Sequence, residues 1–328
     1  MNYIDLHCDT LYRLYTQEDT LPDETPWENR GHIDLSRLHK AGALAQFFAC
    51  FLNRKQTPIS ESHYTDALQM IRLLKSSADR HAEVSCAFSF DDYLRNKSAG
   101  KLSCFLTVEE GGILENDMSR LYTLYEEGIR LITLTWNYEN ELGFPHNMSS
   151  QSGTGLKPFG LEVIGEMERL GMLIDVSHLS DAGFEDVYQN TRKPFVASHS
   201  CCRALCGHSR NLTDRMIRMI GERQGLVGVN FYGTFLQDSG ICSAEVIAEH
   251  LRHIVNVGGI DIAALGSDFD GMSCEMELAG CQDMPLLLPA LEKAGFTSGE
   301  IDAICYKNVE RVLEIIYHRM YFLLFLRN

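Results

Sequence analysis

The strongest constraint on the fold of this chain is a repeated switch between two hydrophobic periods. Short apolar runs, many of them rich in β-branched residues, alternate with amphipathic segments of helical period, and a glycine often stands near the end of the helical segment. The change from FGLEVIGEMERLG at 159–171 to MLIDVSH at 172–178 shows the switch most plainly. Strand and helix periods in alternation predict a parallel sheet.

The segments with the period of a strand are 3–8, 44–52, 84–89, 103–109, 130–136, 172–178, 194–200, 226–232 and 262–268. Clear helical segments lie between or after them, at 62–79, 117–127, 159–170, 212–223, 244–257 and 299–315. No proline-rich linker or low-complexity run divides the 328 residues. The pattern therefore predicts a single α/β domain over 1–328 with the (β/α)8 TIM-barrel fold, and it leaves 84–89 as the doubtful strand.

Charge and composition exclude several classes of function. A formal net charge of −16 repels phosphate backbones and anionic lipid, so we expect no nucleic-acid partner and no membrane partner. Eleven cysteines at irregular spacing indicate reduced thiols. The first predicted strand begins at residue 3, so we expect no signal peptide and a cytoplasmic location.

Two other stretches contain residues that could suggest a second metal site or a membrane segment. The cluster SCCRALCGH at 200–208 contains no C-x2-C pair, so it predicts ordinary packing or loop thiols rather than a zinc cage. The apolar run MYFLLFL at 320–326 is too short to cross a membrane. We expect it to pack on the domain or at a subunit contact.

Histidines and acids gather at the carboxyl ends of the predicted strands. The first strand ends in DLHCDT, where His7 and Asp9 stand two residues apart and can point to the same face of an extended strand. Other strands end in a candidate ligand or acid, namely Glu109, His178, His199 and Asp268. Because all strands of a parallel barrel end at one mouth, we expect these side chains to meet there.

Each of these residues also has an ordinary explanation, since a histidine can pack in a core and an acid such as Asp9 can cap a turn or helix. Together, however, uncompensated carboxylates in one cleft would repel one another, and a dication would relieve that repulsion. Histidine and carboxylate donors without thiolates suit zinc in a hydrolytic enzyme. The donors exceed the number that one catalytic zinc needs, so they predict two metal ions bridged by a carboxylate.

The motifs and their order resemble the membrane (renal) dipeptidases and their bacterial relatives. The matching stretches run across nearly the whole chain: DLHCDT, TVEEGG, GIRLITLTWN, GLKPFG, GMLIDVSH, SHS, SRN, VNFY and GSDFDG. The resemblance implies a zinc dipeptidase on a TIM barrel with two zinc ions per chain. It also implies a dipeptide substrate and suggests a homodimer.

The resemblance implies a role for each residue of the centre. The implied ligands are His7 and Asp9 for the first zinc ion, Glu109 as the bridge, and His178 and His199 for the second. Glu110, beside the bridge, is expected to be solvated or to support a ligand.

The expected mechanism follows from the charges. A hydroxide held between the two zinc ions attacks the peptide carbonyl, and Asp268 takes the proton of the attacking water and passes it to the leaving amine. Arg210 falls where the family places the arginine that grips the free carboxylate of the substrate. Short peptides with a free C-terminus are therefore the expected substrates.

One position departs from the family pattern. After TLT some members carry a histidine that contacts the scissile carbonyl, whereas this chain has Trp136. Trp136 is either a bulky wall of the pocket or a substrate-binding residue, and His146 and Asn137 are candidates to replace the lost donor. Two other functions stay open: a related hydrolase of a non-peptide amide or lactam, and a metal-binding protein without catalysis, which only Trp136 favours.

Overall fold

The structure is a computed structural model, and it describes residues 1–17, 19–151 and 153–317. Parallel strands form a closed ring, because β4 pairs with β2 as well as with β5. In the order of the ring the strands are β1 (Tyr3–Asp5), β2 (Ala43–Phe51), β4 (Leu102–Glu109), β5 (Ile129–Thr133), β6 (Leu173–Asp175), β7 (Val196–Ala197), β8 (Leu226–Val229) and β9 (Ala263–Leu265). The predicted (β/α)8 barrel is confirmed.

A further strand, β3 (Val84–Cys86), lies outside the ring. It pairs with residues 102–104, the first part of β4, whereas β5 pairs with the later part of the same strand. The doubtful segment 84–89 is therefore a strand over three residues, but it takes no place in the barrel.

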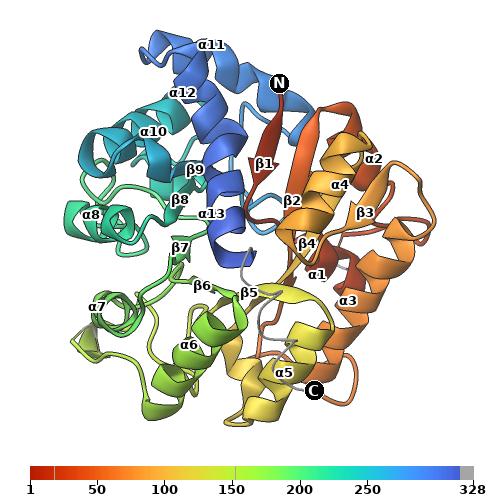
Figure 1. Cartoon of the computed structure of the whole chain (residues 1–328), viewed down its shortest axis with the longest axis vertical. Helices are drawn as coiled ribbons and strands as arrows, with labels where there is room; N and C mark the ends of the chain where they lie inside the picture. Colours follow the sequence, from red (N-terminus) through yellow and green to blue (C-terminus); the bar gives the residue numbers. More distant parts are fainter. Residues whose placement is uncertain (18, 152, 318–328) are drawn as a thin grey trace.

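Helices surround the ring and connect its strands (Figure 1). The α-helices are α1 (Thr10–Thr16), α2 (Leu35–Lys40), α3 (His63–Ala78), α4 (Phe90–Ser98), α5 (Met118–Glu126), α6 (Pro158–Leu170), α7 (Asp181–Asn190), α8 (Asp214–Glu222), α9 (Gly233–Leu236), α10 (Ala244–Gly258), α11 (Leu287–Lys293), α12 (Ser298–Asp302) and α13 (Asn308–Tyr317). The short 3-10 helices are η1 (Gly111–Leu114), η2 (Ser149–Gln151), η3 (Ile260–Ile262) and η4 (Cys281–Leu286), and η5 (Ala303–Lys307) is a π-helix.

The predicted helices all occur, and their bounds differ from the prediction by at most two residues. The predicted helix 299–315 corresponds to α12, η5 and α13 in succession, with the π turn in its middle. The apolar run 320–326 lies outside the described residues. Among the helices that are described, none combines the length and the apolar character needed to cross a bilayer.

Several ring strands are shorter than predicted, and buried carboxylates explain why. β1 ends at Asp5, whose Oδ1 accepts the backbone N–H of Ser267 at 2.7 Å. β6 ends at Asp175, whose Oδ1 accepts the backbone N–H of Ser198 at 2.9 Å. These N–H groups bond to side chains instead of to the neighbouring strand, so the regular ladder stops before the predicted ends of the strands.

The amino-terminal end of the barrel is closed by α13, which lies across the middle of the ring in Figure 1. Its residues Val312 and Leu313 are buried in one apolar cluster with Leu173, Val196 and Leu226, each of which begins a strand. A second apolar cluster lies between the ring and the outer helices. Because this end of the barrel is filled, the functional residues are left with the carboxyl end.

Candidate metal centre

The predicted metal ligands and Asp268 all lie at the carboxyl end of the barrel. Glu109 is the last residue of β4, and the others follow the ends of β1, β6, β7 and β9 by two to four residues. A cavity of about 520 Å³ opens at this point. The residues of the set that line it are Asp9, Glu109, His178 and Asp268.

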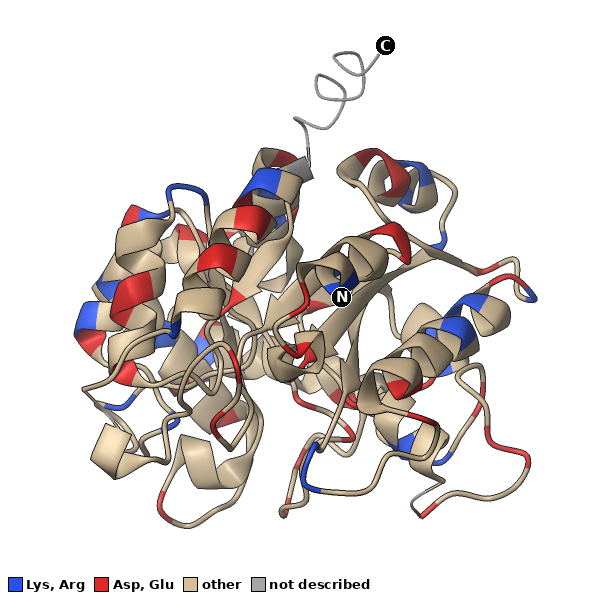
Figure 2. Ribbon diagram, turned by 90° about the horizontal axis from the view of Figure 1, so that it is seen from below, with Lys and Arg blue, Asp and Glu red and all other residues tan. Residues whose placement is uncertain are grey.

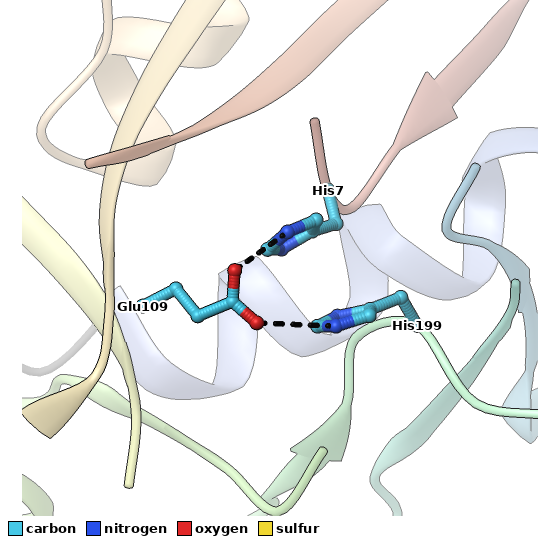
Figure 3. A group of neighbouring side chains, drawn as sticks. All are labelled: His7, Glu109 and His199. Carbon is cyan, nitrogen blue, oxygen red and sulfur yellow. Dashed lines mark ion pairs between the residues drawn. The ribbon is translucent and has the colours of Figure 1, made fainter. Parts of the chain in front are cut away.

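Glu109 stands at the centre of the cluster and directs its two carboxylate oxygens to different imidazoles (Figure 3). Its Oε2 lies 3.4 Å from Nε2 of His7. Its Oε1 lies 3.5 Å from Nε2 of His199 and 3.0 Å from Nε2 of His178. One carboxylate therefore connects two separate groups of nitrogen donors.

The rings of His178 and His199 have partners for their outer nitrogens. Nδ1 of His178 lies 3.0 Å from Oδ1 of Asn137, and Nδ1 of His199 lies 2.7 Å from Oγ of Ser198. An acceptor at Nδ1 holds the ring proton there and leaves a lone pair on Nε2. The two Nε2 atoms face each other at 3.0 Å, where their lone pairs repel unless a cation lies between them.

Two further carboxylates lie beside His7. Asp9 Oδ2 is 3.6 Å and Asp268 Oδ1 is 3.8 Å from Nε2 of His7. Oδ2 of Asp268 accepts a hydrogen bond of 2.9 Å from the side-chain amide of Asn230. Asp9 precedes α1 but makes no side-chain capping bond, so its carboxylate remains with His7.

The strand predicted over 3–8 is shorter than expected, and His7 and Asp9 are placed differently for that reason. Both residues lie beyond the end of β1 and not within an extended strand. The two side chains still come within 3.6 Å of each other. The backbone between them stays paired with its neighbours, since Ala49 N–H donates to the carbonyl of Cys8 and Asp9 N–H to that of Phe269, both at 2.9 Å.

The electrostatics of the cluster are set by carboxylates and imidazoles that are buried close together. The pKa of Glu109 is raised to about 8, mainly by burial and in part by Asp9, against the opposing effect of His7. Burial by itself lowers the pKa of His7, but the carboxylates of Glu109 and Asp9 raise it well above its usual value. Burial also raises the pKa of Asp268 to about 6. Buried carboxylates that repel one another beside imidazole nitrogens fit a site for divalent cations.

Glu110 is buried and supports its surroundings, so it is not solvated. Its carboxylate accepts hydrogen bonds from the backbone N–H groups of Gly112 at 2.9 Å and Trp136 at 3.0 Å, and from the side-chain amide of Asn140 at 2.7 Å. The backbone of Glu110 has a φ of 88°, which turns its side chain away from the course of β4. It therefore fixes the loop that follows Glu109.

Arg210 lies beside the cavity, although it is not among the residues that line it. It is 3% exposed, and its guanidinium donates to Oγ of Ser200 at 2.6 Å and to the carbonyl of His199 at 2.8 Å. Its Nε–H is buried without an acceptor. The guanidinium lies 5.7 Å from the ring centroid of Phe235, which does line the cavity.

Trp136 forms part of an aromatic wall of the cavity. Its ring centroid lies 4.8 Å from that of Phe51 and 6.4 Å from that of His178. Asn137 also lines the cavity, and its Oδ1 contacts both His178 and Nε2 of His146, the latter at 3.3 Å. His146 contacts Ser209 and is not among the lining residues, so Asn137 is the better placed of the two candidate donors.

The cysteine cluster forms no cage. The thiols of Cys201, Cys202 and Cys206 each donate to a different backbone carbonyl, those of Asn230, His250 and Thr234. The prediction of packing thiols agrees with these separate bonds.

Several residues around the cavity were not predicted from the sequence. Tyr12, Tyr232 and Phe235 line the cavity, and Asn230 bonds to Asp268. A signal was present for Asn230 and Tyr232, because both belong to the stretch VNFY that follows β8. Tyr12 belongs to α1, which the hydrophobic period did not predict.

Comparisons with known proteins agree with this geometry. A family model for membrane dipeptidases (peptidase family M19) matches residues 1–319. An uncharacterized dipeptidase of Schizosaccharomyces pombe, C965.12, is 30% identical over 94% of this chain and 79% of its own. Dipeptidase aclJ of Aspergillus oryzae is 31% identical over 88% of this chain and 71% of its own.

A solved structure is similar over almost the whole length. It is a metallopeptidase from Rhodobacter sphaeroides, crystallised with a phosphinate mimic of the dipeptide L-Ala-D-Ala. The two structures share a TM-score of 0.86 and 27% identity over 97% of this chain and 99% of that one. The predicted class of enzyme, a metal-dependent hydrolase acting as a dipeptidase, is confirmed, and the chain belongs to the membrane dipeptidase family, peptidase family M19.

Proposed function

We propose that this chain hydrolyses the peptide bond of dipeptides that have a free C-terminal carboxylate, at a centre of two zinc ions. The observation that carries the proposal is that the two carboxylate oxygens of Glu109 contact different histidines. Its Oε2 faces His7, and its Oε1 faces His178 and His199. His7 and Asp9 form one group of donors on the first side. The two histidines on the other side form the second group.

The choice of zinc rests on the chemistry of the donors. Imidazole nitrogens and carboxylate oxygens without a thiolate are typical of catalytic zinc sites. When bound, two such ions supply Lewis acidity that polarises a carbonyl oxygen and makes a water molecule more acidic. Glu109, placed between the donor groups, offsets charge on both sides.

The remaining residues of the site move the proton and hold the substrate. Asp268 faces the centre with Oδ1, while Asn230 holds its Oδ2, so one oxygen is free to take the proton of the attacking water. The same oxygen then returns the proton to the leaving amine. Arg210 binds the terminal carboxylate of the substrate, and its bonds to Ser200 and His199 keep the guanidinium in place.

Activity on matched substrates tests the proposal. Protein purified without chelator should contain about two zinc ions per chain, since a bridged pair needs both. It should cleave free dipeptides and cleave their C-terminally amidated forms much more slowly, because the loss of a charge-assisted pair costs ~1.5–3 kcal/mol. Equal rates on both forms would contradict the carboxylate clamp, and at most one metal ion in fully active protein would contradict the bridged centre.

Two properties of the whole protein stay predictions. We propose a cytoplasmic location and a homodimer. Cell fractionation tests the location, and sedimentation of the purified protein tests the homodimer.

A further inference from the structure

Two pairs of neighbouring strands share one arrangement of buried polar residues. Asp5 ends β1, and its carboxylate accepts the backbone N–H of Ser267 at 2.7 Å and the hydroxyl of Ser267 at 2.6 Å. Asp175 ends β6, and its carboxylate accepts the backbone N–H of Ser198 at 2.9 Å and the hydroxyl of Ser198 at 2.6 Å. Both aspartates are buried. We call these the two Asp–Ser pairs.

Each serine stands directly before a residue of the proposed centre. Ser267 precedes Asp268, and Ser198 precedes His199. The pairs differ in the second contact of the serine hydroxyl. Ser198 Oγ lies 2.7 Å from Nδ1 of His199, whereas Ser267 Oγ lies 3.3 Å from the backbone carbonyl of His7.

The bonds of Asp175 determine where the protons of its partners lie. Oδ1 accepts the backbone N–H groups of Ser177 at 3.0 Å and Ser198 at 2.9 Å. Oδ2 accepts the hydroxyls of Thr133 and Ser198, both at 2.6 Å. The hydroxyl proton of Ser198 is therefore directed to Asp175, and its oxygen is left to accept the Nδ1–H of His199.

We propose that Asp175 is a positioning residue that acts through Ser198 to fix the tautomer of His199, so that Nε2 is free to bind a metal ion. The inference rests on the proposed metal centre for its consequence, but the tautomer itself is a property of the protein without metal. A fixed proton on Nδ1 is what a ligand that binds through Nε2 requires.

Asp175→Asn reverses this arrangement without changing the shape of the side chain. The two backbone N–H groups cannot rotate, so the amide oxygen stays at the position of Oδ1 and the NH2 group faces the hydroxyls. Ser198 Oγ then accepts from the amide and turns its own proton to Nδ1 of His199. The other oxygen within reach is Ser177 Oγ, at the longer distance of 3.4 Å. The ring proton of His199 moves to Nε2, which blocks metal binding there.

Asp5→Asn is the matched control, since it makes the same substitution in the other Asp–Ser pair. Here the hydroxyl of Ser267 can accept from the amide and donate to the carbonyl of His7, which already lies 3.3 Å away. No imidazole depends on the direction of this bond. The control therefore measures what the loss of a buried carboxylate costs by itself.

The experiment combines a tautomer measurement with a metal titration. In the metal-free wild type, 15N NMR of the histidine rings should show His199 protonated at Nδ1, and in Asp175→Asn protonated at Nε2. Zinc affinity, measured by competition with a chelator, should fall by about 10–100-fold in Asp175→Asn, the range found when a residue that orients a ligand is lost. Asp5→Asn should change it much less.

Two outcomes overturn the inference: His199 keeps its Nδ1 proton in Asp175→Asn, or both aspartate variants lose zinc affinity equally. If Asp175→Asn does not fold, Ser198→Ala gives the same test, because it removes the acceptor of the Nδ1 proton. An unchanged tautomer together with unchanged zinc affinity in Ser198→Ala contradicts the inference. A wild type that binds no zinc overturns the proposed function, while the tautomer measurement still decides the role of Asp175.

Discussion

Glu109 is the residue on which both halves of the proposed centre depend. Glu109→Gln should lose metal and activity together, because a neutral amide cannot offset two dications and presents an N–H to one of the donor groups. Asp66→Asn is the control, since Asp66 is also a buried carboxylate but bonds to Tyr15, Ile59 and Ser60 away from the centre. Elemental analysis of both variants provides the measurement. Two metal ions retained in Glu109→Gln would contradict the bridge.

Asp268 is proposed to move the proton, and its substitution separates that role from metal binding. Asp268→Asn should keep both metal ions and lower kcat by ~10²-fold or more, the usual effect of losing an acid or base. Oδ1 of Asp268 lies 3.8 Å from Nε2 of His7, close enough that a role as a ligand has to be tested. Metal content and kcat are measured on the same preparation. Loss of metal would make Asp268 a ligand.

Trp136 stands where some family members have a histidine, and we expect it to act as a wall. Trp136→Phe should leave kcat on a good dipeptide nearly unchanged, because the proposed metal ions would polarise the carbonyl. If the indole N–H instead donates a hydrogen bond in the transition state, kcat and kcat/KM fall together. The loss of transition-state stabilisation is then up to ~2.7–4 kcal/mol, the cost of removing one oxyanion donor. Trp27 does not line the cavity, so Trp27→Phe is the control for the loss of an indole elsewhere in the fold. A drop in kcat of tenfold or more, with metal content intact, would contradict the expectation that Trp136 is only a wall of the cavity.

At the scale of residues, the sequence indicates which side chains meet but not what orients them. His178 and His199 stand three and two residues after the ends of β6 and β7, so their convergence follows from the barrel. Asp175 and Ser198 resemble any polar residues at a strand end. Their importance comes from bonds across neighbouring strands, and these depend on a register that no local pattern encodes.

At the scale of elements, most of the long amphipathic segments were predictable and the short elements were not, although α7, with ten residues, was missed. α3, α6 and α10 have a clear apolar face, and their bounds follow from it. α1 and α9 have seven and four residues, too few for a period to be recognised. The strands end early because side chains such as those of Asp5 and Asp175 take over backbone bonds, a tertiary effect.

The helix α13 gives a stability prediction. Leu313→Ala should lower the free energy of unfolding by about 2–5 kcal/mol, the cost of a cavity in a packed core, because Leu313 is fully buried at the closed end of the barrel. Glu314→Ala on the exposed side of the same helix should change it by less than ~0.5 kcal/mol. Urea unfolding of both variants is the measurement. Equal small effects would show that α13 does not belong to the core.

At the scale of the whole molecule, charge should influence the encounter with substrate. The chain has a formal net charge of −16, although acidic and basic residues are interspersed on the outer helices (Figure 2). A negative field attracts cationic dipeptides, and salt screens it over ~10 Å at 0.1 M. We expect kcat/KM for lysine-containing dipeptides to fall as salt is added, and that for glutamate-containing ones to rise. The same salt dependence for both would contradict this steering.

Because α13 closes one end of the barrel, the cavity that holds the proposed centre is not a channel through the barrel. Val312 and Leu313 fill the amino-terminal end, so within the described part of the chain the proposed centre opens only in the other direction. The two amino acids set free must leave through the entrance by which the dipeptide arrived. A product amino acid and an incoming dipeptide then cannot pass through the entrance at the same time. We expect a product that is still in the entrance to delay binding of the next substrate without altering the catalytic groups.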